Sequence, residues 1–313
     1  MAGLYSTTVT PTERRQAFRD GLTSGKIQRF PGAFSPLVAR AIQEAGFDGV
    51  YVSGAVVAAD LALPDIGLTT LTEVAHRSRQ IARVTDLPVL VDADTGFGEP
   101  MSAARTISEF EDAGVAGCHL EDQVNPKRCG HLDGKEVVPT ELMLRRITAA
   151  VNERRDDQFV ICARTDAAGV EGIDAAIERA KAYADAGADL IFTEALHTPA
   201  DFEKFRAAVD VPLLANMTEF GKSDLLSAQQ LEDLGFNAVI YPVTTLRIAM
   251  GQVEEALTEI AETGTQTGWL DRMQHRSRLY ELLRYNEYNA FDQQVFTYSA
   301  DNYQSTFTSP ERG

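Results

Sequence analysis

The segment from Asn125 to His131 reads NPKRCGH and places the thiol of Cys129 beside a lysine, an arginine and a histidine. Cysteine is most often a small buried hydrophobic residue, but neighbouring cations stabilise its thiolate. A thiol in such surroundings can act as a nucleophile or as an acid. Cys129 and His131 are too close for a zinc site alone, and the sequence has no second C-x-x-C or H-x-x-x-H pair. The segment therefore favours a chemical role for Cys129.

Two carboxylates end the apolar run LPVLVDAD. Asp92 and Asp94 alternate with Ala93, so an extended backbone turns both carboxylates to one side. Like charges this close need a cation between them. Hard oxygen ligands suit Mg²⁺, which binds through one or two carboxylates and keeps several waters. A loop-capping pair of aspartates is an equal alternative, but Glu121, expected on the neighbouring strand, favours the metal site.

Polar residues recur where the other apolar runs of the chain end. Singly, each could belong to a structural ion pair; Asp122 is interpreted in this way, and Arg164 could be the partner in such a pair. Their recurrence at the ends of successive runs is better explained by one shared site. In chain order these residues are Tyr51, Ser53, Gly54, His119, Glu121, Asp122, Arg164, Asp166, Glu194, Asn216, Thr218 and Arg247.

The elements that must position these residues are eight short runs, each apolar almost throughout, that alternate with helical segments. Such runs are typical of parallel strands covered on both faces. Eight strand–helix units in about 250 residues predict an α/β fold, a (β/α)8 barrel, whose chemistry lies at the carboxyl ends of the strands. The runs span residues 26–34, 49–54, 87–94, 115–122, 159–166, 189–195, 211–217 and 237–243.

Helical segments are expected between these runs, for example over 36–46, 101–114, 173–187 and 227–235. Each of these four ends in a glycine, which tolerates the left-handed conformation that stops a helix. A doubly wound open sheet is the rival architecture, and it needs a glycine-rich phosphate turn after an early strand. DADTGFGEP offers G-x-G there, but Pro100 follows where the third glycine belongs. The barrel is therefore favoured.

Composition narrows the class of protein further. The chain has 313 residues, of which 44% are hydrophobic, and we expect one domain over 1–313. A net charge of −17 argues against a nucleic-acid partner. The segment MAGLYSTTVTPTERRQ lacks the apolar core of a signal peptide, no run is long enough to span a membrane, and three cysteines without framework spacing suit a reducing compartment. A cytoplasmic protein is expected.

The C-terminal part of the chain is predicted to be helical beyond the last strand. One helix is expected from Thr244 to Glu262, and a further helical stretch over 269–288 belongs to an extension that begins at about residue 268. The aromatic and leucine spacing in this extension would suit a surface that covers the barrel or docks on another subunit. A flexible tail is expected from about residue 300.

The chain resembles the isocitrate lyase and phosphoenolpyruvate mutase superfamily along nearly its whole length. The motifs that carry the resemblance include VDADTGFG, GCHLEDQ, KRCGH, ARTDA, NMTEFG and YPVTTLR, and K-R-C-G-H is specific to the lyase branches. The resemblance implies a (β/α)8 barrel that exchanges its last helix between the subunits of a homotetramer. It also implies a small-molecule tricarboxylate as substrate, with no nucleic-acid or membrane partner.

The activity implied by the resemblance is a Mg²⁺-dependent retro-aldol cleavage of a tricarboxylate, with Mn²⁺ possible in place of Mg²⁺. The preferred reaction cleaves 2-methylisocitrate into pyruvate and succinate, a step of the methylcitrate cycle in propionate catabolism. The alternatives are isocitrate cleavage into glyoxylate and succinate, an oxaloacetate-type or C–P enzyme, and an inactive binding scaffold. Phe192 and Pro242 stand where isocitrate lyases usually carry Trp and Thr, which would leave room for the extra methyl group.

The resemblance also assigns roles to single residues. Cys129 would protonate the succinate carbanion, and the base stays open between Tyr51 and Asp65. The predicted catalytic residues are Cys129, Tyr51, Asp65 and His131. The predicted metal site consists of Asp92, Asp94 and Glu121. The predicted substrate contacts are Ser53, Gly54, Ala55, Gly130, Arg164, Glu194, Asn216, Thr218, Arg247 and Gly264.

Overall fold

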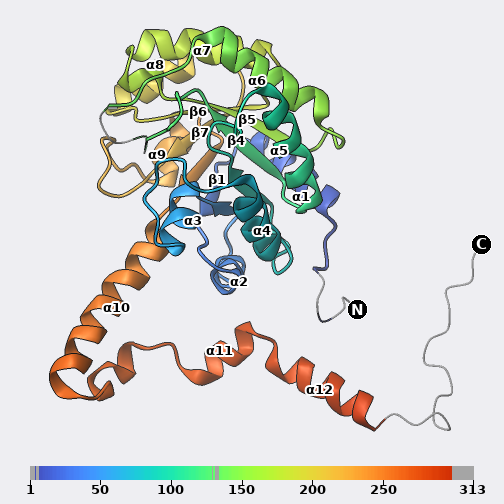
Figure 1. Cartoon of the computed structure of the whole chain (residues 1–313), viewed down its shortest axis with the longest axis vertical. Coiled ribbons are helices and arrows are strands. Elements are labelled where there is room, and N and C mark those ends of the chain that lie inside the picture. The colour runs from blue at the N-terminus through green and yellow to red at the C-terminus, as the bar shows by residue number, and fades with distance from the viewer. Residues whose placement is uncertain (1–3, 5–6, 129, 131–133, 298–313) are drawn as a thin grey trace, which may run out of the picture.

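Eight parallel strands surround the centre of the molecule in a computed structural model that describes residues 4, 7–128, 130 and 134–297 (Figure 1). Each predicted apolar run contains one strand. The strands are β1 (Gln28–Pro31), β2 (Val50–Val52), β3 (Val89–Asp92), β4 (Gly117–Glu121), β5 (Val160–Thr165), β6 (Leu190–Thr193), β7 (Leu213–Asn216) and β8 (Ala238–Tyr241).

The order of the strands identifies a nearly closed barrel. Each strand from β2 to β8 pairs in parallel with the next, and β8 pairs with β1 through the register Gln28↔Ala238. A single parallel bridge, Gly32↔Tyr51, links β1 to β2. An open doubly wound sheet has two free edges and does not bring its first and last strands together. The predicted (β/α)8 barrel is therefore confirmed, and the open-sheet alternative is excluded.

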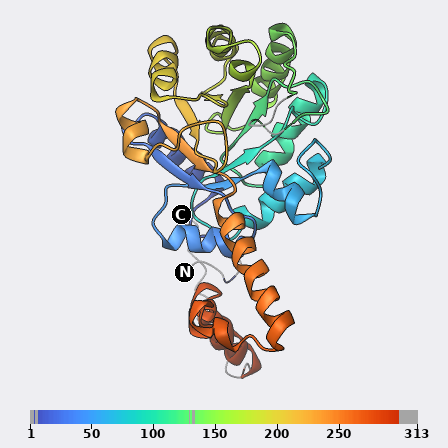
Figure 2. The same cartoon turned by 90° about the vertical axis from the view of Figure 1, so that its left-hand side faces the viewer.

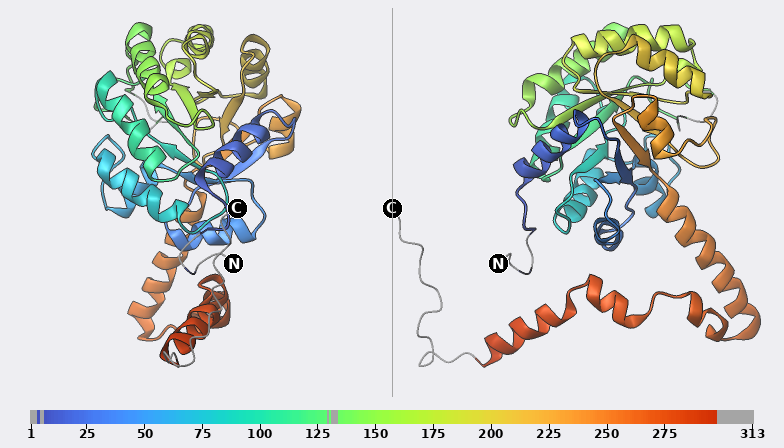
Figure 3. Two further views of the ribbon diagram at one scale, coloured as in Figure 1. Left: turned by 90° about the vertical axis from the view of Figure 1, so that its right-hand side faces the viewer. Right: turned by 180° about the vertical axis from the view of Figure 1, so that it is seen from behind.

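Helices cover the outside of the barrel, as the views in Figures 2 and 3 show. Local sequence signals begin and end them. Thr70 and Glu73 form a reciprocal capping box at the start of one helix, and the predicted stop glycines have positive φ angles, such as +74° at Gly46 and +101° at Gly187. The helices of the barrel are α1 (Pro11–Leu22), α2 (Pro36–Glu44), α3 (Gly54–Asp60), α4 (Leu71–Ala82), α5 (Pro100–Asp112), α6 (Thr140–Glu153), α7 (Ile173–Asp185), α8 (Pro199–Ala208) and α9 (Ala228–Asp233).

The apolar core has two layers. The outer layer lies between the strands and the surrounding helices. The inner layer fills the barrel, and it includes Phe18 and Leu22 of α1 beside strand residues such as Leu90 and Phe192. Because α1 also binds the backbone that precedes β4 and β5, through Arg15 and Arg19, it closes the amino-terminal end of the barrel. The carboxyl ends of the strands are left for the polar residues.

The C-terminal extension leaves the barrel along α10 (Thr244–Thr263), which has no buried residue and projects outward (Figures 1 and 2). The prediction of one continuous helical stretch over 269–288 is wrong. A short 3₁₀ helix (Thr267–Arg272), α11 (Arg276–Leu282) and α12 (Tyr285–Phe296) occupy this region, because extended backbone at Met273 and a left-handed Arg284 interrupt the helix. No helix in the described part of the chain has the length and apolar character needed to cross a membrane.

Candidate active site

A small cavity lies at the carboxyl ends of the strands and gathers most of the predicted site residues. Its volume is about 50 Å³, which exceeds the roughly 10–15 Å³ needed to hold one water. The predicted residues that line it are Tyr51, Ser53, Ala55, Asp65, Asp92, Gly130, Arg164, Glu194, Asn216 and Thr218. Lys127, Arg128, Phe192, Ile240, Pro242 and Val243 complete the lining.

The Asp92–Asp94 pair meets at the first turn of α3. Asp92 ends β3, and its carboxylate accepts hydrogen bonds from the backbone N–H of Gly54 at 3.1 Å and of Asp94 at 3.0 Å. A side chain at Gly54 would lie 2.9 Å from Asp92 Oδ2 and 3.1 Å from Asp94 Oδ1. Both carboxylates therefore converge as predicted, but the argument from an extended strand is wrong at Asp94, whose φ is +45°.

The cation that these carboxylates require is supplied within the protein by Lys127. Its ammonium group lies 2.8 Å from Asp94 Oδ1 and also contacts the carboxylate of Asp65. Burial raises the pKa of Asp94 to about 6, and the charge of Asp92 adds to this rise against the opposing effect of Lys127. Burial also acts against ionised Asp92, but His119, Lys127 and Arg164 bring its pKa below the ordinary value. One ammonium group thus leaves Asp94 only partly stabilised as an anion.

Arg164 on β5 lies among three carboxylates. Its Nε is 2.9 Å from Asp166 Oδ2 and 3.3 Å from Glu121 Oε2, and its Nη2 is 3.1 Å from Glu194 Oε2. The guanidinium group also packs over the ring of Phe192, 4.9 Å from its centre. The predicted residues of β4, β5 and β6 therefore form one buried charged cluster.

Glu121 and Glu194 have different surroundings within this cluster. The Nδ2 of Asn216 lies 3.2 Å from Glu194 Oε2, so the side chains from β6 and β7 meet. Burial raises the pKa of Glu121 well above its ordinary value, although Arg164 acts in the opposite direction. Its Oε1 is buried and has no hydrogen-bond partner among the residues that the structure describes.

Tyr51 forms a buried pair with His119, which the sequence analysis placed at a strand end without giving it a role. The phenol oxygen lies 2.7 Å from His119 Nε2. Burial lowers the pKa of His119 to about 4, so the imidazole is neutral at neutral pH. Burial, reinforced by the charge of Asp92, raises the pKa of Tyr51 well above its ordinary value. The phenol therefore keeps its proton.

Several predicted residues lie away from the cavity or outside the described part of the chain. Arg247, on the first turn of α10, lies at the rim, with Nη1 3.3 Å from Thr218 Oγ1 and 2.7 Å from Glu219 Oε2. Gly264 ends α10, which projects from the barrel, so the chain does not bring it to the other predicted residues. Cys129 and His131 lie outside the described residues.

The structural interpretations of the remaining polar residues are confirmed. Asp122 accepts hydrogen bonds from Thr165 and Tyr183, each at 2.8 Å, and lies 3.5 Å from Arg179. Cys118 and Cys162 are completely buried, and burial raises the pKa of both thiols. Sequence analysis did not identify the contacts of Gln123, which ends the motif GCHLEDQ, or of Lys135, whose sequence signal is its closeness to KRCGH.

The oxygen donors at the end of β3 fit a magnesium ion. Two carboxylates converge there, burial and the charge of Asp92 raise the pKa of Asp94, and Glu121 offers a buried oxygen without a hydrogen-bond partner in the described chain. Over the described residues, no three His, Cys, Asp or Glu side chains form a ready-made cage. Mg²⁺ needs no such cage, because it binds through one or two carboxylates and completes its shell with water and substrate.

A parallel barrel with buried carboxylates, an arginine and a lysine at the carboxyl ends of its strands is characteristic of the TIM-barrel enzymes. Comparison with known proteins defines the family more narrowly. Residues 18–261 match the family model described as phosphoenolpyruvate phosphomutase. The chain therefore belongs to the phosphoenolpyruvate mutase/isocitrate lyase superfamily.

Individual relatives cover nearly the whole chain. A "probable 2-methylisocitrate lyase 2" of Corynebacterium glutamicum is 85% identical over 98% of this chain and 100% of its own length. The 2-methylisocitrate lyase of Escherichia coli K12 is 44% identical over 87% of this chain and 93% of its own. A structure of phosphonopyruvate hydrolase with oxalate and Mg²⁺ is 28% identical, with a TM-score of 0.83 over 91% of this chain and 99% of the other.

Proposed function

We propose that this chain cleaves 2-methylisocitrate into pyruvate and succinate. The observation that carries the proposal is that relatives bearing the name 2-methylisocitrate lyase, with "probable" added for the two that are 85% and 79% identical, range from 43% to 85% identity over most of the chain. The phosphonopyruvate hydrolase structure shows that the fold alone does not choose the reaction, since a protein with the same barrel carries another name. The cavity supports the proposal because its lining combines carboxylates with cations that can bind a substrate's carboxylate groups.

The proposed reaction begins with loss of the substrate's hydroxyl proton. Mg²⁺, held through Asp92 and Asp94 with Glu121 behind them, would supply a Lewis acid that lowers the pKa of that hydroxyl. Because Tyr51 keeps its proton, we assign the base to Asp65, whose carboxylate lines the cavity and contacts Lys127. The phenol of Tyr51 then donates a hydrogen bond rather than accepting the proton.

Cleavage of the carbon–carbon bond leaves an electron pair on the carbon that becomes a methylene of succinate. Arg164 and Asn216 line the cavity and would supply donors to the carboxylate into which this charge is delocalised. Cys129 would supply the proton that completes succinate, so one proton leaves the hydroxyl and one joins the carbon. Lys127 is directed at Asp65 and Asp94, and its ammonium group is therefore engaged by carboxylates.

The second candidate is isocitrate cleavage, and the apolar wall of the cavity bears on the choice. Phe192 and Pro242 both line the cavity. These are the two positions where isocitrate lyases usually carry other residues than this chain. Discrimination by one methyl group in an apolar pocket is worth only about 1–3 kcal/mol. We therefore propose a preference for 2-methylisocitrate with residual cleavage of isocitrate.

A product assay tests the proposal directly. Purified protein with Mg²⁺ is offered 2-methylisocitrate and isocitrate separately, and pyruvate, glyoxylate and succinate are measured. We expect pyruvate and succinate from 2-methylisocitrate at a kcat/KM about 10–200-fold above that for isocitrate. EDTA should abolish cleavage and added Mg²⁺ should restore it. Preferential glyoxylate formation would reverse the substrate assignment, and full activity after metal removal would overturn the metal assignment.

We also propose that the chain works as a homotetramer in the cytoplasm. Apolar side chains on α10 are exposed, including Ile248 at 64% and Leu257 at 59%. Because α10 projects outward, an apolar groove lined by Val38, Ile42 and Tyr241 stays open on the outer face of β1 and β8. Exchange of the extension between two copies would cover such surfaces. Light scattering should give a tetramer, and a monomer at working concentration would contradict the exchange. The cytoplasmic location rests on the cysteine pattern of the sequence.

A further inference from the structure

Two buried side chains hold the backbone on either side of residue 129. We propose that Gln123 and Lys135 are positioning residues, which fix the Arg128 and Gly130 peptides of the KRCGH motif for the proposed proton transfer. This inference rests on the proposed function, because it deepens the account of the same site. The KRCGH motif lies between Gln123 and Lys135 in the sequence, and neither residue is part of it.

Gln123 binds the Arg128 backbone with both ends of its amide. Its Nε2 donates to the Arg128 carbonyl oxygen at 2.9 Å, and its Oε1 accepts from the Arg128 N–H at 2.8 Å. The residue is completely buried. Its own backbone is fixed by an antiparallel bridge to Val137. The Val138 N–H also donates to the Asp122 carbonyl at 2.8 Å. The two ends of the loop over residues 123–137 are therefore joined.

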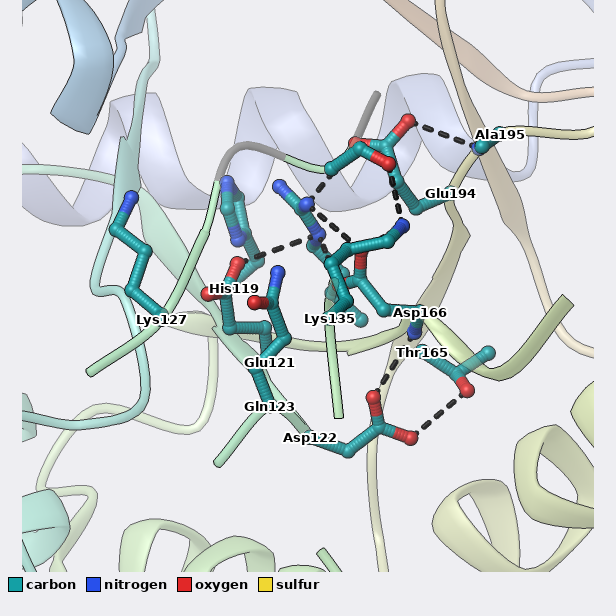
Figure 4. Close-up of polar contacts among 12 residues, drawn as sticks. His119, Glu121, Asp122, Gln123, Lys127, Lys135, Thr165, Asp166, Glu194 and Ala195 are labelled. Atoms are coloured by element: carbon teal, nitrogen blue, oxygen red, sulfur yellow. Dashed lines mark hydrogen bonds and ion pairs between the residues drawn. The ribbon is translucent and has the colours of Figure 1, made fainter. Parts of the chain in front are cut away.

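Lys135 binds the backbone on the other side. Its ammonium group contacts the carbonyl oxygen of Gly130 and lies 2.9 Å from Asp166 Oδ1 (Figure 4). Only 4% of the Lys135 side chain is exposed, and Asp166 is completely buried. Asp166 also pairs with Arg164. Lys135 therefore links the loop backbone to the same charged cluster that lines the cavity.

The position of Gly130 leaves little freedom in this arrangement. A Cβ at Gly130 would lie 2.4 Å from Arg164 Nη2 and 2.5 Å from Glu194 Cγ, so the peptide packs directly against the Arg164–Glu194 pair. Residue 129 lies outside the described residues, but it is covalently joined to Arg128 and Gly130. A displacement of about 1 Å in a catalytic group can lower a rate about 10²-fold, so we expect the rate to depend on how firmly the Arg128 and Gly130 peptides are held.

Polar side chains that serve only a surface loop are usually solvated, because loops run over the protein surface. Gln123 and Lys135 instead bury their polar groups, and each directs them at the backbone of the KRCGH motif. Burying a lysine is unfavourable unless it is paired and hydrogen-bonded, and Asp166 and the Gly130 carbonyl meet that need. These contacts therefore fix the positions of the Arg128 and Gly130 peptides, which packing of apolar side chains alone would not do.

Substitutions that remove the polar groups but keep side-chain length test the proposal by kinetics. Lys135→Met and Gln123→Met should each lower kcat by about 10–100-fold while KM changes less than about 3-fold, because the lost precision affects the transition state most. Lys135→Arg keeps the charge and should recover part of the loss. Lys181→Met, at an exposed pair with Glu178, is the matched control and should leave kcat unchanged. Thermal melts confirm that each variant is folded.

Alkylation of Cys129, followed by mass spectrometry at that peptide, gives a readout that does not depend on turnover. Cys118 and Cys162 are completely buried, so they serve as unreactive internal standards. The plateau rate at high pH, where the thiolate is fully formed, should rise at least about 3-fold in Lys135→Met and in Gln123→Met, because a looser backbone exposes the thiol.

The outcomes separate this proposal from the proposed function. Folded methionine variants with wild-type kcat and wild-type alkylation would overturn the positioning role while the lyase assignment stands. A wild-type protein that cleaves neither tricarboxylate would overturn the lyase assignment, and the alkylation rates would still decide the positioning role. Lost kcat with unchanged alkylation would also count against positioning, since it would place the effect in the Asp166–Arg164 pair and not in the loop backbone.

Discussion

The two ends of the barrel each bury an arginine, but they surround it differently. At the amino-terminal end, Arg15 of α1 donates to the carbonyl oxygens of Val115 at 3.0 Å and Glu111 at 2.8 Å, and pairs with Asp156 at 2.7 Å. Each of its guanidinium nitrogens has a partner. At the carboxyl end, Arg164 lies among three carboxylates, one of which, Glu121, has an oxygen without a hydrogen-bond partner in the described chain.

The surroundings of Arg15 stabilise the fold, whereas those of Arg164 belong to the candidate active site. Two carbonyl groups and one carboxylate give each guanidinium nitrogen of Arg15 a partner, so this buried arginine is fully paired. At the carboxyl end, burial raises the pKa values of Asp94 and Glu121, and nearby carboxylates add to the rise: Asp92 acts on both groups, and Asp166 acts on Glu121. Groups with strongly shifted pKa values concentrate at functional sites. We therefore expect a cation to bind among the carboxylates at the carboxyl ends of the strands and not beside Arg15.

The largest effect is expected for Cys129→Ser, which sharpens the comparison at the functional end. Serine keeps the size and polarity but is a far weaker acid, so kcat should fall by about 10²–10⁴-fold or more with a smaller change in KM. Steady-state kinetics give the result, and unchanged Mg²⁺ binding is the control because Asp92 and Asp94 lie on another strand. A near-normal kcat would mean that another group donates the proton.

Arg15→Met tests the structural end of the barrel. The change removes one donor from each of two carbonyls and from the Asp156 carboxylate, so the free energy of unfolding should fall by about 3 kcal/mol. Turnover per folded molecule should stay within about 2-fold, because Arg15 is at the far end of the barrel. Urea denaturation and kinetics provide the two measurements. Lys204→Met, at an exposed pair with Asp174, is the control, and a loss of turnover without a loss of stability would break the comparison.

Asp94→Asn should stabilise the metal-free protein while removing activity. Because burial raises the pKa of Asp94 to about 6, the native state binds this proton more tightly than the unfolded chain between about pH 4 and pH 6. The contribution of Asp94 to stability is thus fully present below about pH 4, falls as the pH rises to about 6, and stays low above it. The asparagine variant lacks this loss and tolerates the positive φ.

Urea denaturation in EDTA at pH 4 and pH 7 measures this effect. At pH 7 the variant should be more stable than the wild type by on the order of 1–3 kcal/mol, and at pH 4 the difference should vanish. Asp233→Asn, on the exposed surface of α9, provides the control with no such pH dependence. A variant that is less stable at both pH values would show that Asp94 stabilises the fold instead.

The smallest effect is expected for Cys118→Ser and Cys162→Ser. Both thiols are completely buried in apolar surroundings, so a hydroxyl group there should lower the free energy of unfolding by about 1–2 kcal/mol. Turnover should not change, in contrast to Cys129→Ser. Thermal melts and kinetics of the three variants together decide whether chemistry is confined to one thiol, and a fall in kcat in either core variant would contradict that division.

The fold was predictable from the sequence because its signals are local. A buried parallel strand needs a short apolar run, and a helix end needs a residue that tolerates positive φ, such as Gly46 or Gly187. The runs after the first carried polar residues at or near their carboxyl ends, and the barrel brings those ends together. The same reasoning failed over 269–288, where His275 accepts a hydrogen bond from the Ser277 backbone and begins a new helix, and where Arg284 adopts a left-handed conformation.

Most of the candidate site was also predictable, but as a set of residues and not as a set of contacts. The sequence by itself determined which residues stand at the strand ends and that Asp92 and Asp94 would require a cation. Only the tertiary structure decided that Lys127 supplies one cation, that Lys135 binds Gly130, and that Gly264 lies far from the rest. The reason is physical: strand periodicity fixes where a side chain leaves the backbone, whereas a long flexible side chain takes its partner from whatever the folded loops bring within reach.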